Sequence, residues 1–145
     1  MPRYFTLEQA NRLLPAVRDA VQLAVRLKPV LESAENELRE INRKVMVSGG
    51  MMVDRQHVGE LRQDRDRAVE QIRDALEKIS TIGCQVKDLD TGLLDFPTLY
   101  RGEEVSLCWR LGEERIEFWH GSEGFRGRKP IDDDFLANHQ GDPEH

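Results

Sequence analysis

Residues 10–45 read ANRLLPAVRDAVQLAVRLKPVLESAENELREINRKV, and small or aliphatic side chains recur in them at alternating intervals of three and four residues. A stripe that repeats every 3.5 residues is typical of helices that pack against each other along their length. The stretch therefore predicts one long helix with a continuous packing face. Its stripe consists of Ala10, Leu13, Val17, Ala20, Ala24, Leu27, Leu31, Ala34, Leu38, Ile41 and Val45.

A second, shorter stripe with the same spacing follows a break at Ser48, Gly49 and Gly50. Because the break is short, the two helices should lie antiparallel as a coiled-coil-like hairpin. Arg65 falls on this stripe, where it could reach the edge, pair with an acid or contact another subunit. The second stripe consists of Val58, Leu61, Arg65, Ala68, Ile72, Ala75 and Ile79.

Capping signals predict where the helices begin and end. Thr6, followed three residues later by Gln9, is typical of a capping box at the start of the first helix. Asp54 is a suitable cap for the second helix, and Gly83 should end it. The predicted hairpin therefore spans residues 6–81.

Two prolines interrupt the first helix. Pro15 and Pro29 each remove a backbone donor, so each should kink the helix or end a segment, and residues 7–13 are an alternative separate short helix. The first helix is longer than the second by about 16 Å at 1.5 Å per residue. Residues 7–19 should therefore extend beyond the hairpin and be covered by residues 84–120.

The region after Gly83 has the pattern of a small antiparallel sheet. Short runs of extended character are separated by Asp-, Gly- and Tyr-containing turns. Six of the nine aromatic residues lie between residues 96 and 125, which indicates an aromatic core in this part. We predict an α+β fold, a long helical hairpin followed by a β-meander of about four strands. The expected strands are residues 84–88, 93–96, 104–110 and 115–120.

Alternation along these strands predicts which side chains share a face. A slip of one residue would exchange the two faces of a strand. The face expected to lie on the helices carries Leu94, Phe96, Val105, Leu107, Trp109, Ile116, Phe118 and His120. The opposite face carries Asp95, Ser106, Cys108, Arg110, Glu117 and Trp119.

The net charge of −6 is concentrated at the C-terminus. Residues 131–145 hold five acidic and no basic residues, and the rest of the chain is almost neutral, with 21 basic and 22 acidic residues. We expect one domain over residues 1–131, with a sheet head at 82–131, and an acidic, mobile tail at 132–145. A neutral body argues against nucleic-acid binding.

The composition also bears on location. No run of about 20 apolar residues is present, as a membrane span needs, and the start lacks the apolar stretch of a secretory signal. Cys84 and Cys108 do not make a disulfide framework and are expected as thiols. The expected location is the cytoplasm.

Asp88 begins the run Asp-Leu-Asp-Thr-Gly, residues 88–92, which admits two interpretations. The pattern is similar to the nucleophile motif of haloacid-dehalogenase-like phosphotransferases, and partly to a calcium loop. The alternating α/β pattern of the former and the later glutamate of the latter are missing. The favoured interpretation is a strand connection whose carboxylates bind turn amides.

His120, at the end of the last predicted strand, is a candidate metal ligand or acid–base group. Asp88, Asp95 and Glu113 are carboxylates that could join it, and Cys108 could join them only if separate strands brought it close. No second histidine has ligand spacing to His120. A histidine bonded to a backbone carbonyl at the sheet edge is the favoured alternative.

The glycine-rich stretch 121–129 carries Arg126, Arg128 and Lys129 beside Phe125. Such residues can contact phosphates or nucleic acid. They suit equally a loop in which an arginine pins strand carboxylates, and three cations are too few to be specific.

Several runs together resemble a bacterial family of unknown function, DUF2203. The resemblance covers nearly all of residues 4–131, implies a helical hairpin with a small sheet, and implies no established activity. The matching runs are YFTLEQAN at 4–11, LLP at 13–15, Gly83, VKDLDTGLLDFP at 86–97, VSLCWRLGE at 105–113, IEFWH at 116–120 and GFRGRKP at 124–130.

Three functional hypotheses follow. The sequence favours a non-catalytic module that forms a homodimer or binds a partner protein through the hairpin. The second is a small-ligand or metal-binding protein, or an enzyme, with a divalent metal as candidate cofactor and His120 and Asp95 as candidate ligands. The weakest is nucleic-acid binding through Arg126, Arg128 and Lys129. The candidate ligand-binding set is Asp88, Asp95, His120, Arg126 and Arg128.

Overall fold

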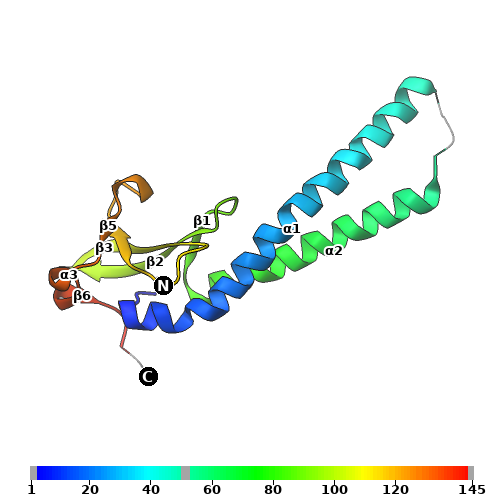
Figure 1. Ribbon diagram of the computed structural model, residues 1–145. Helices are drawn as coiled ribbons and strands as arrows, with labels where there is room; N and C mark the ends of the chain where they lie inside the picture. The colour runs from blue at the N-terminus through cyan, green and yellow to red at the C-terminus, as the bar shows by residue number, and fades with distance from the viewer. Residues whose placement is uncertain (1–2, 50–52, 144–145) are drawn as a thin grey trace.

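The structure, a computed structural model, describes residues 3–49 and 53–143. Two long helices, α1 (Leu7–Ser48) and α2 (Arg55–Ile82), pack as an antiparallel hairpin, and an antiparallel sheet follows them. Figure 1 shows the hairpin extending away from the sheet as a long arm. The predicted α+β class is confirmed.

Local capping interactions begin and end both helices as predicted. Thr6 Oγ1 accepts a hydrogen bond from Gln9 N at 3.1 Å, and Gln9 Oε1 accepts one from Thr6 N at 2.9 Å, which completes the capping box. Asp54 caps α2. Gly49 and Gly83 end the two helices in left-handed conformations, with φ of 69° and 109°. The second glycine of the break lies outside the described residues.

Helix α1 continues through both prolines, so a separate helix at residues 7–13 is wrong. Both rings lie on the exposed side of the helix, where a missing backbone donor disturbs no packing. The first, blue turns of α1 run in a different direction from the rest (Figure 1). Pro15 lies in this part of the helix and accounts for the bend.

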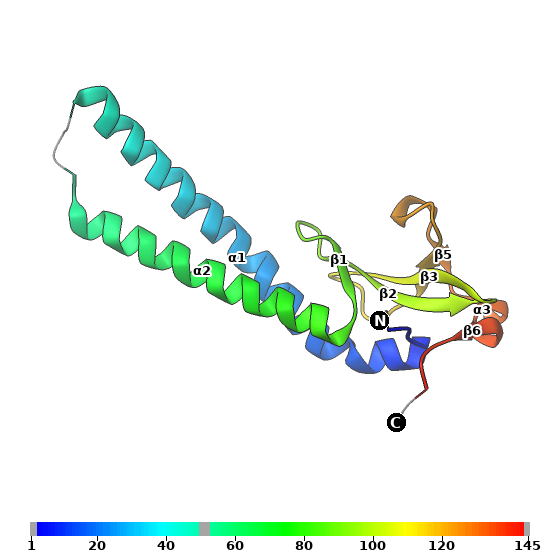
Figure 2. The ribbon, with the colours of Figure 1, turned by 180° about the vertical axis from the view of Figure 1, so that it is seen from behind.

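The overhanging start of α1 lies under the sheet, as the difference in helix length predicts (Figures 1 and 2). Leu14 and Val17 are buried in one hydrophobic core with strand side chains. The largest members of this core are Trp109, Phe5, Phe96, Phe135, Ile79, Leu94, Leu107 and Ile116.

The sheet is a meander in the order β1-β2-β3-β4-β5, and a sixth strand pairs with β2. It therefore holds more strands than the predicted four, because two further strands are only two residues long. The strands are β1 (Gln85–Asp88), β2 (Leu93–Tyr100), β3 (Glu103–Arg110), β4 (Phe118–His120), β5 (Lys129–Pro130) and β6 (His139–Gln140).

Strand β2 is longer than predicted because it continues through Pro97 to Tyr100. A proline offers no amide hydrogen to a neighbouring strand. At this point the edge of β2 is covered by the N-terminal segment, where Phe5 N donates to Pro97 O at 2.8 Å. The missing donor therefore costs the sheet no hydrogen bond.

The faces predicted for β4 are wrong by one residue. Trp119 pairs with Leu107, and His120 pairs with Ser106, so Trp119 shares the core face. The cause lies outside the sheet: Ile116 N donates to the side chain of Asn11 on α1 at 2.9 Å. This contact holds the preceding segment against α1, and the strand begins at Phe118 rather than at residue 115.

The mobility predicted for the acidic tail is also wrong for residues 132–143. This stretch forms α3 (Asp133–Asn138) and β6, and its Phe135 is fully buried. Asp142 N then donates to Tyr4 O at 2.9 Å. One large aromatic side chain outweighs the repulsion of exposed like charges, because burying a phenylalanine contributes about 1.5–3 kcal/mol. Residues 144–145 lie outside the described residues.

The end of the hairpin far from the sheet, residues 30–49 and 53–68, is called the distal arm below. Met46 and Val47 are 75% and 76% exposed there. Arg65 is half-buried and pairs with Asp66 at 3.1 Å. Over the described ranges, no helix has both the length and the apolar character that crossing a membrane requires.

Candidate metal site in the sheet head

Three neighbouring strands bring Asp95, Cys108 and His120 together. Asp95 on β2 is the direct partner of Cys108 on β3, so the two side chains share one face of the sheet. His120 on β4 is paired with Ser106, two residues from Cys108, and therefore lies on this same face. The ligand atoms of the three side chains all lie within 4.8 Å of one another.

This group, called the triad below, is shielded from solvent. Asp95 is 1% exposed, His120 6% and Cys108 0%. Nε2 of His120 lies 3.0 Å from Oδ1 of Asp95, and Nδ1 lies 2.9 Å from the carbonyl oxygen of Gly121. A carbonyl only accepts hydrogen bonds, so Nδ1 carries a proton.

The protonated Nδ1 determines what Nε2 can do. In a neutral imidazole, Nε2 then bears a lone pair that faces the carboxylate and the thiol. Either a second proton or a metal ion must lie between Nε2 and Asp95, because two lone pairs would repel each other. A histidine whose Nδ1–H binds a backbone carbonyl is the usual arrangement of a metal ligand.

Cys108 does not act as a nucleophile in this arrangement. Burial raises the pKa of its thiol to about 11, and the nearby carboxylate of Asp95 adds to that shift. The thiol is therefore protonated at neutral pH, and a protonated thiol is a poor nucleophile. Both ring nitrogens of His120 have other partners, so the histidine is not available as a base for the sulfur.

A fixed ion pair lies beside the triad. Arg128 is 3.1 Å from Glu113, and both side chains are largely buried. The guanidinium also stacks on Phe118 and Phe125, at 4.1 Å and 4.6 Å from the ring centroids. Because Glu113 balances Arg128, this ion pair adds no net charge beside the triad.

Comparison with known proteins agrees with the family resemblance of the sequence. The family model DUF2203, described as an uncharacterized conserved protein, matches residues 3–131. The chain belongs to the DUF2203 family. No curated protein and no solved structure matches it. The triad, Glu113 and Arg128 all lie inside the part of the chain that matches DUF2203.

The five residues predicted as candidate ligands do not all lie together in the structure. Asp95 and His120 are in direct contact, and Arg128 lies beside them in this DUF2203 head. Asp88 ends β1, where it accepts hydrogen bonds from Asp90 N at 3.0 Å and Thr91 Oγ1 at 3.1 Å of the following connection. This confirms the strand-connection interpretation. Arg126 is exposed on the 3-10 turn η1 (Phe125–Gly127), away from the triad.

Cys108 and Glu113 are the residues of this region that the candidate set lacks. The alternation of β3 already placed Cys108 on the face of Asp95, so the signal for Cys108 was present. His120 was predicted on the opposite face, because the start of β4 depends on a contact with α1. The triad therefore follows from the sequence only once the register of β4 is known.

Proposed function

We propose that the protein binds a transition metal ion, with zinc as the best match, through the triad. The proposal rests on one observation: a histidine nitrogen, a cysteine sulfur and a carboxylate oxygen converge in a buried site, and a backbone carbonyl orients the histidine. Zinc is bound in proteins by these three kinds of atoms. This function corresponds to the second of the hypotheses raised from the sequence.

The separations of the donor atoms support the proposal. Two nitrogen or oxygen ligands of a tetrahedral zinc ion lie about 3.3 Å apart, since each bond measures about 2.0–2.1 Å. Nε2 of His120 and Oδ1 of Asp95 are 3.0 Å apart, so a small outward movement makes room for the ion. Bound zinc would also deprotonate Cys108, because a coordinating thiol loses its proton.

Three protein ligands leave a fourth position of a tetrahedral zinc ion open. This is the usual arrangement of sites that hold a water molecule or a small ligand on the metal. Arg128 is the nearest fixed cation and would lie beside such a ligand. The proposal therefore concerns metal binding, and it allows a small-molecule ligand without requiring a reaction.

The test uses the full-length protein and cobalt as a spectroscopic substitute for zinc. We expect about one metal ion per chain and a thiolate-to-cobalt absorption band. The band should disappear in Cys108→Ser and persist in Cys84→Ser, a matched variant at a buried thiol outside the triad. Folded protein that binds no metal, or that binds it equally after His120→Ala, would contradict the proposal.

The distal arm supports a second function, association with another copy. Near its end, Met46, Val47 and Val53 are apolar side chains that the described residues leave exposed. A homodimer formed through the arm is the first hypothesis from the sequence.

Free thiols at Cys84 and Cys108 fit a reducing compartment, and we propose the cytoplasm as the location of the protein.

Sedimentation tests this second function. Wild-type protein at tens of micromolar should sediment as a dimer, and Met46→Lys with Val47→Lys should shift it to the monomer. Leu136→Lys, a change at an exposed apolar residue of α3, is the control and should leave the dimer intact. A wild-type monomer would contradict the homodimer.

A further inference from the structure

The last described residues, 132–143, cover an aromatic surface of the sheet head; we call them the C-terminal segment. Phe135 stacks on Tyr100 with ring centroids 4.9 Å apart and planes 7° apart. The same ring stacks on Trp119, also at 4.9 Å. His139, from the segment itself, closes the other side at 5.1 Å. The rings of Tyr100 and Trp119 also contact each other, with centroids 5.1 Å apart, so Phe135 packs on a joint aromatic surface of these two residues. We call this surface the slot.

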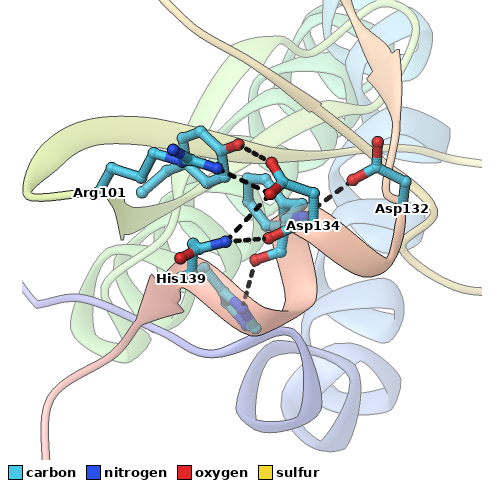
Figure 3. A network of polar contacts seen from close by, with 7 residues as sticks. Arg101, Asp132, Asp134 and His139 are labelled. Carbon is cyan, nitrogen blue, oxygen red and sulfur yellow. Dashed lines mark hydrogen bonds and ion pairs between the residues drawn. The ribbon is translucent and has the colours of Figure 1, made fainter.

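Charge complementarity adds to this aromatic contact. The carboxylate of Asp134 accepts hydrogen bonds from the hydroxyl of Tyr100 and from Arg101, the latter at 2.7 Å (Figure 3). Lys129 lies over the ring of Trp119, 4.9 Å from its centroid. The slot thus has basic residues at its rim, and the segment that fills it is acidic.

The backbone of the segment extends the sheet. Strand β6 pairs with the edge of β2, with Leu99 opposite Gln140 and Tyr100 opposite His139. Thr98 Oγ1 also donates to Gln140 O at 3.2 Å. Strand addition at a sheet edge, with a side chain in a neighbouring pocket, is a common mode of peptide recognition.

The surface under the segment lies inside the part of the chain that the family model matches, and the segment lies beyond it. Tyr100, Arg101 and Trp119 lie within the residues that match DUF2203, and the match ends at residue 131. Apart from Phe135, every buried member of the main hydrophobic core lies between residues 5 and 116. That core is therefore complete in all but one side chain without the segment.

We propose that the slot formed by Tyr100 and Trp119, with Arg101 and the edge of β2, is a binding site for an acidic peptide of a partner protein that carries a phenylalanine. The C-terminal segment is the intramolecular ligand of this site and competes with the partner. Its tether gives it a high effective concentration, so the partner binds only weakly until the segment is displaced. This inference is independent of the metal proposal, because no residue of the triad lines the slot.

The experiment uses the full-length chain and, as probe, a fluorescent peptide with the sequence of residues 131–143. Phe135→Ala in the protein removes the ring of the intramolecular ligand while leaving the slot unchanged. We expect this variant to bind the probe about tenfold more tightly than the wild type does, since the competitor is weakened. A probe that itself carries the Phe135→Ala change should not bind.

A second protein variant gives a result that does not depend on the folding of Phe135→Ala. Asp134→Ala leaves Phe135 in place and removes the contacts to Tyr100 and Arg101, so it should give a smaller gain in probe binding. Absence of probe binding to folded variants would overturn the proposal. Loss of the whole fold in Phe135→Ala would also overturn it, because the segment would then be part of the core. Exchange of the segment between two copies, seen as a dimer that Phe135→Ala abolishes, would assign the slot to a second copy and overturn the partner claim.

Discussion

Asp95 and His120 form a buried pair of ionisable side chains in the sheet head. Both are buried, and each leaves the other uncompensated when it is removed. Removing one partner of a buried charged pair is far more costly than removing a surface charge, since the remaining group stays desolvated. Structural and metal-binding roles of this pair therefore have to be tested separately.

Without metal, Asp95→Ala should lower the free energy of unfolding by about 3–5 kcal/mol. Asp95→Asn should lower it less, because the amide oxygen can still accept a hydrogen bond from Nε2–H of His120. Urea denaturation in the presence of a chelator measures both. Asp88→Ala, at an exposed carboxylate of the β1–β2 connection, is the control and should have a small effect. Equal small losses in all three variants would count against a buried charged pair.

Gly92 is a position where both the backbone and the space require glycine. Its φ is +69°, and an added Cβ would lie 2.6 Å from Cβ of Leu111. Gly102 has a φ of +84° with nothing within 4 Å, so it isolates the backbone effect. Alanine at either site should cost about 1–2 kcal/mol for the left-handed conformation. Gly92→Ala should cost more than Gly102→Ala in urea denaturation, and equal costs would contradict the steric argument.

At the scale of the elements, different contacts join the two helices at the two ends of the hairpin. Near the sheet, α1 and α2 share the main core, with Ala24 of α1 and Ala75 of α2 its outermost buried members on the two helices. In the distal arm, a hydrogen-bonded pair joins the helices across the hairpin, with Nε2 of His57 2.7 Å from Oε1 of Glu37. Polar contacts at exposed sites are weak, so the distal arm should open more easily than the part near the sheet.

The His57–Glu37 pair predicts a pH dependence of the distal arm. The hydrogen bond that His57 donates to the carboxylate of Glu37 raises the pKa of His57 above its usual 6.5. Its stabilisation is therefore fully present below pH 6.5 and is lost as the pH rises through the raised pKa. Hydrogen exchange of the first turns of α2, corrected for the intrinsic effect of pH, should show a modest loss of protection. Glu37→Gln should abolish this dependence, and an unchanged dependence would rule out the pair as its cause.

At the scale of the whole molecule, the distal arm extends away from the sheet head. Figure 2 shows the distal arm extending beyond the sheet with no strand beside it. Both tryptophans, Trp109 and Trp119, lie in the head. Signals from the head can therefore be followed while the arm is altered.

Replacing residues 39–64 by a short glycine-containing loop should leave the head folded, because the main core uses neither part of the distal arm. Near-UV circular dichroism and tryptophan fluorescence should be retained while far-UV helical signal falls. Metal binding should also be unchanged, and association should be lost. Loss of the near-UV signal would show that the head depends on the arm.

The sequence by itself determined the hairpin, because its signals are local. The stripe of α1 and the capping contacts of Thr6 and Gln9 act within about one helical turn, so spacing along the chain is sufficient to find them. The turn chemistry of Asp88 was predictable for the same reason. The family resemblance and the α+β class rest on such short-range patterns.

Only the tertiary structure decided the register of β4, the docking of the C-terminal segment and therefore the triad. Asn11 binds Ile116 from 105 positions away, and the pairing of β4 with β3 brings His120 beside Asp95. Phe135 packs on Tyr100 and Trp119, which are likewise distant from it in the sequence. Alternation along a strand has a period of two, so a contact between distant residues that shifts a strand by one position exchanges its faces.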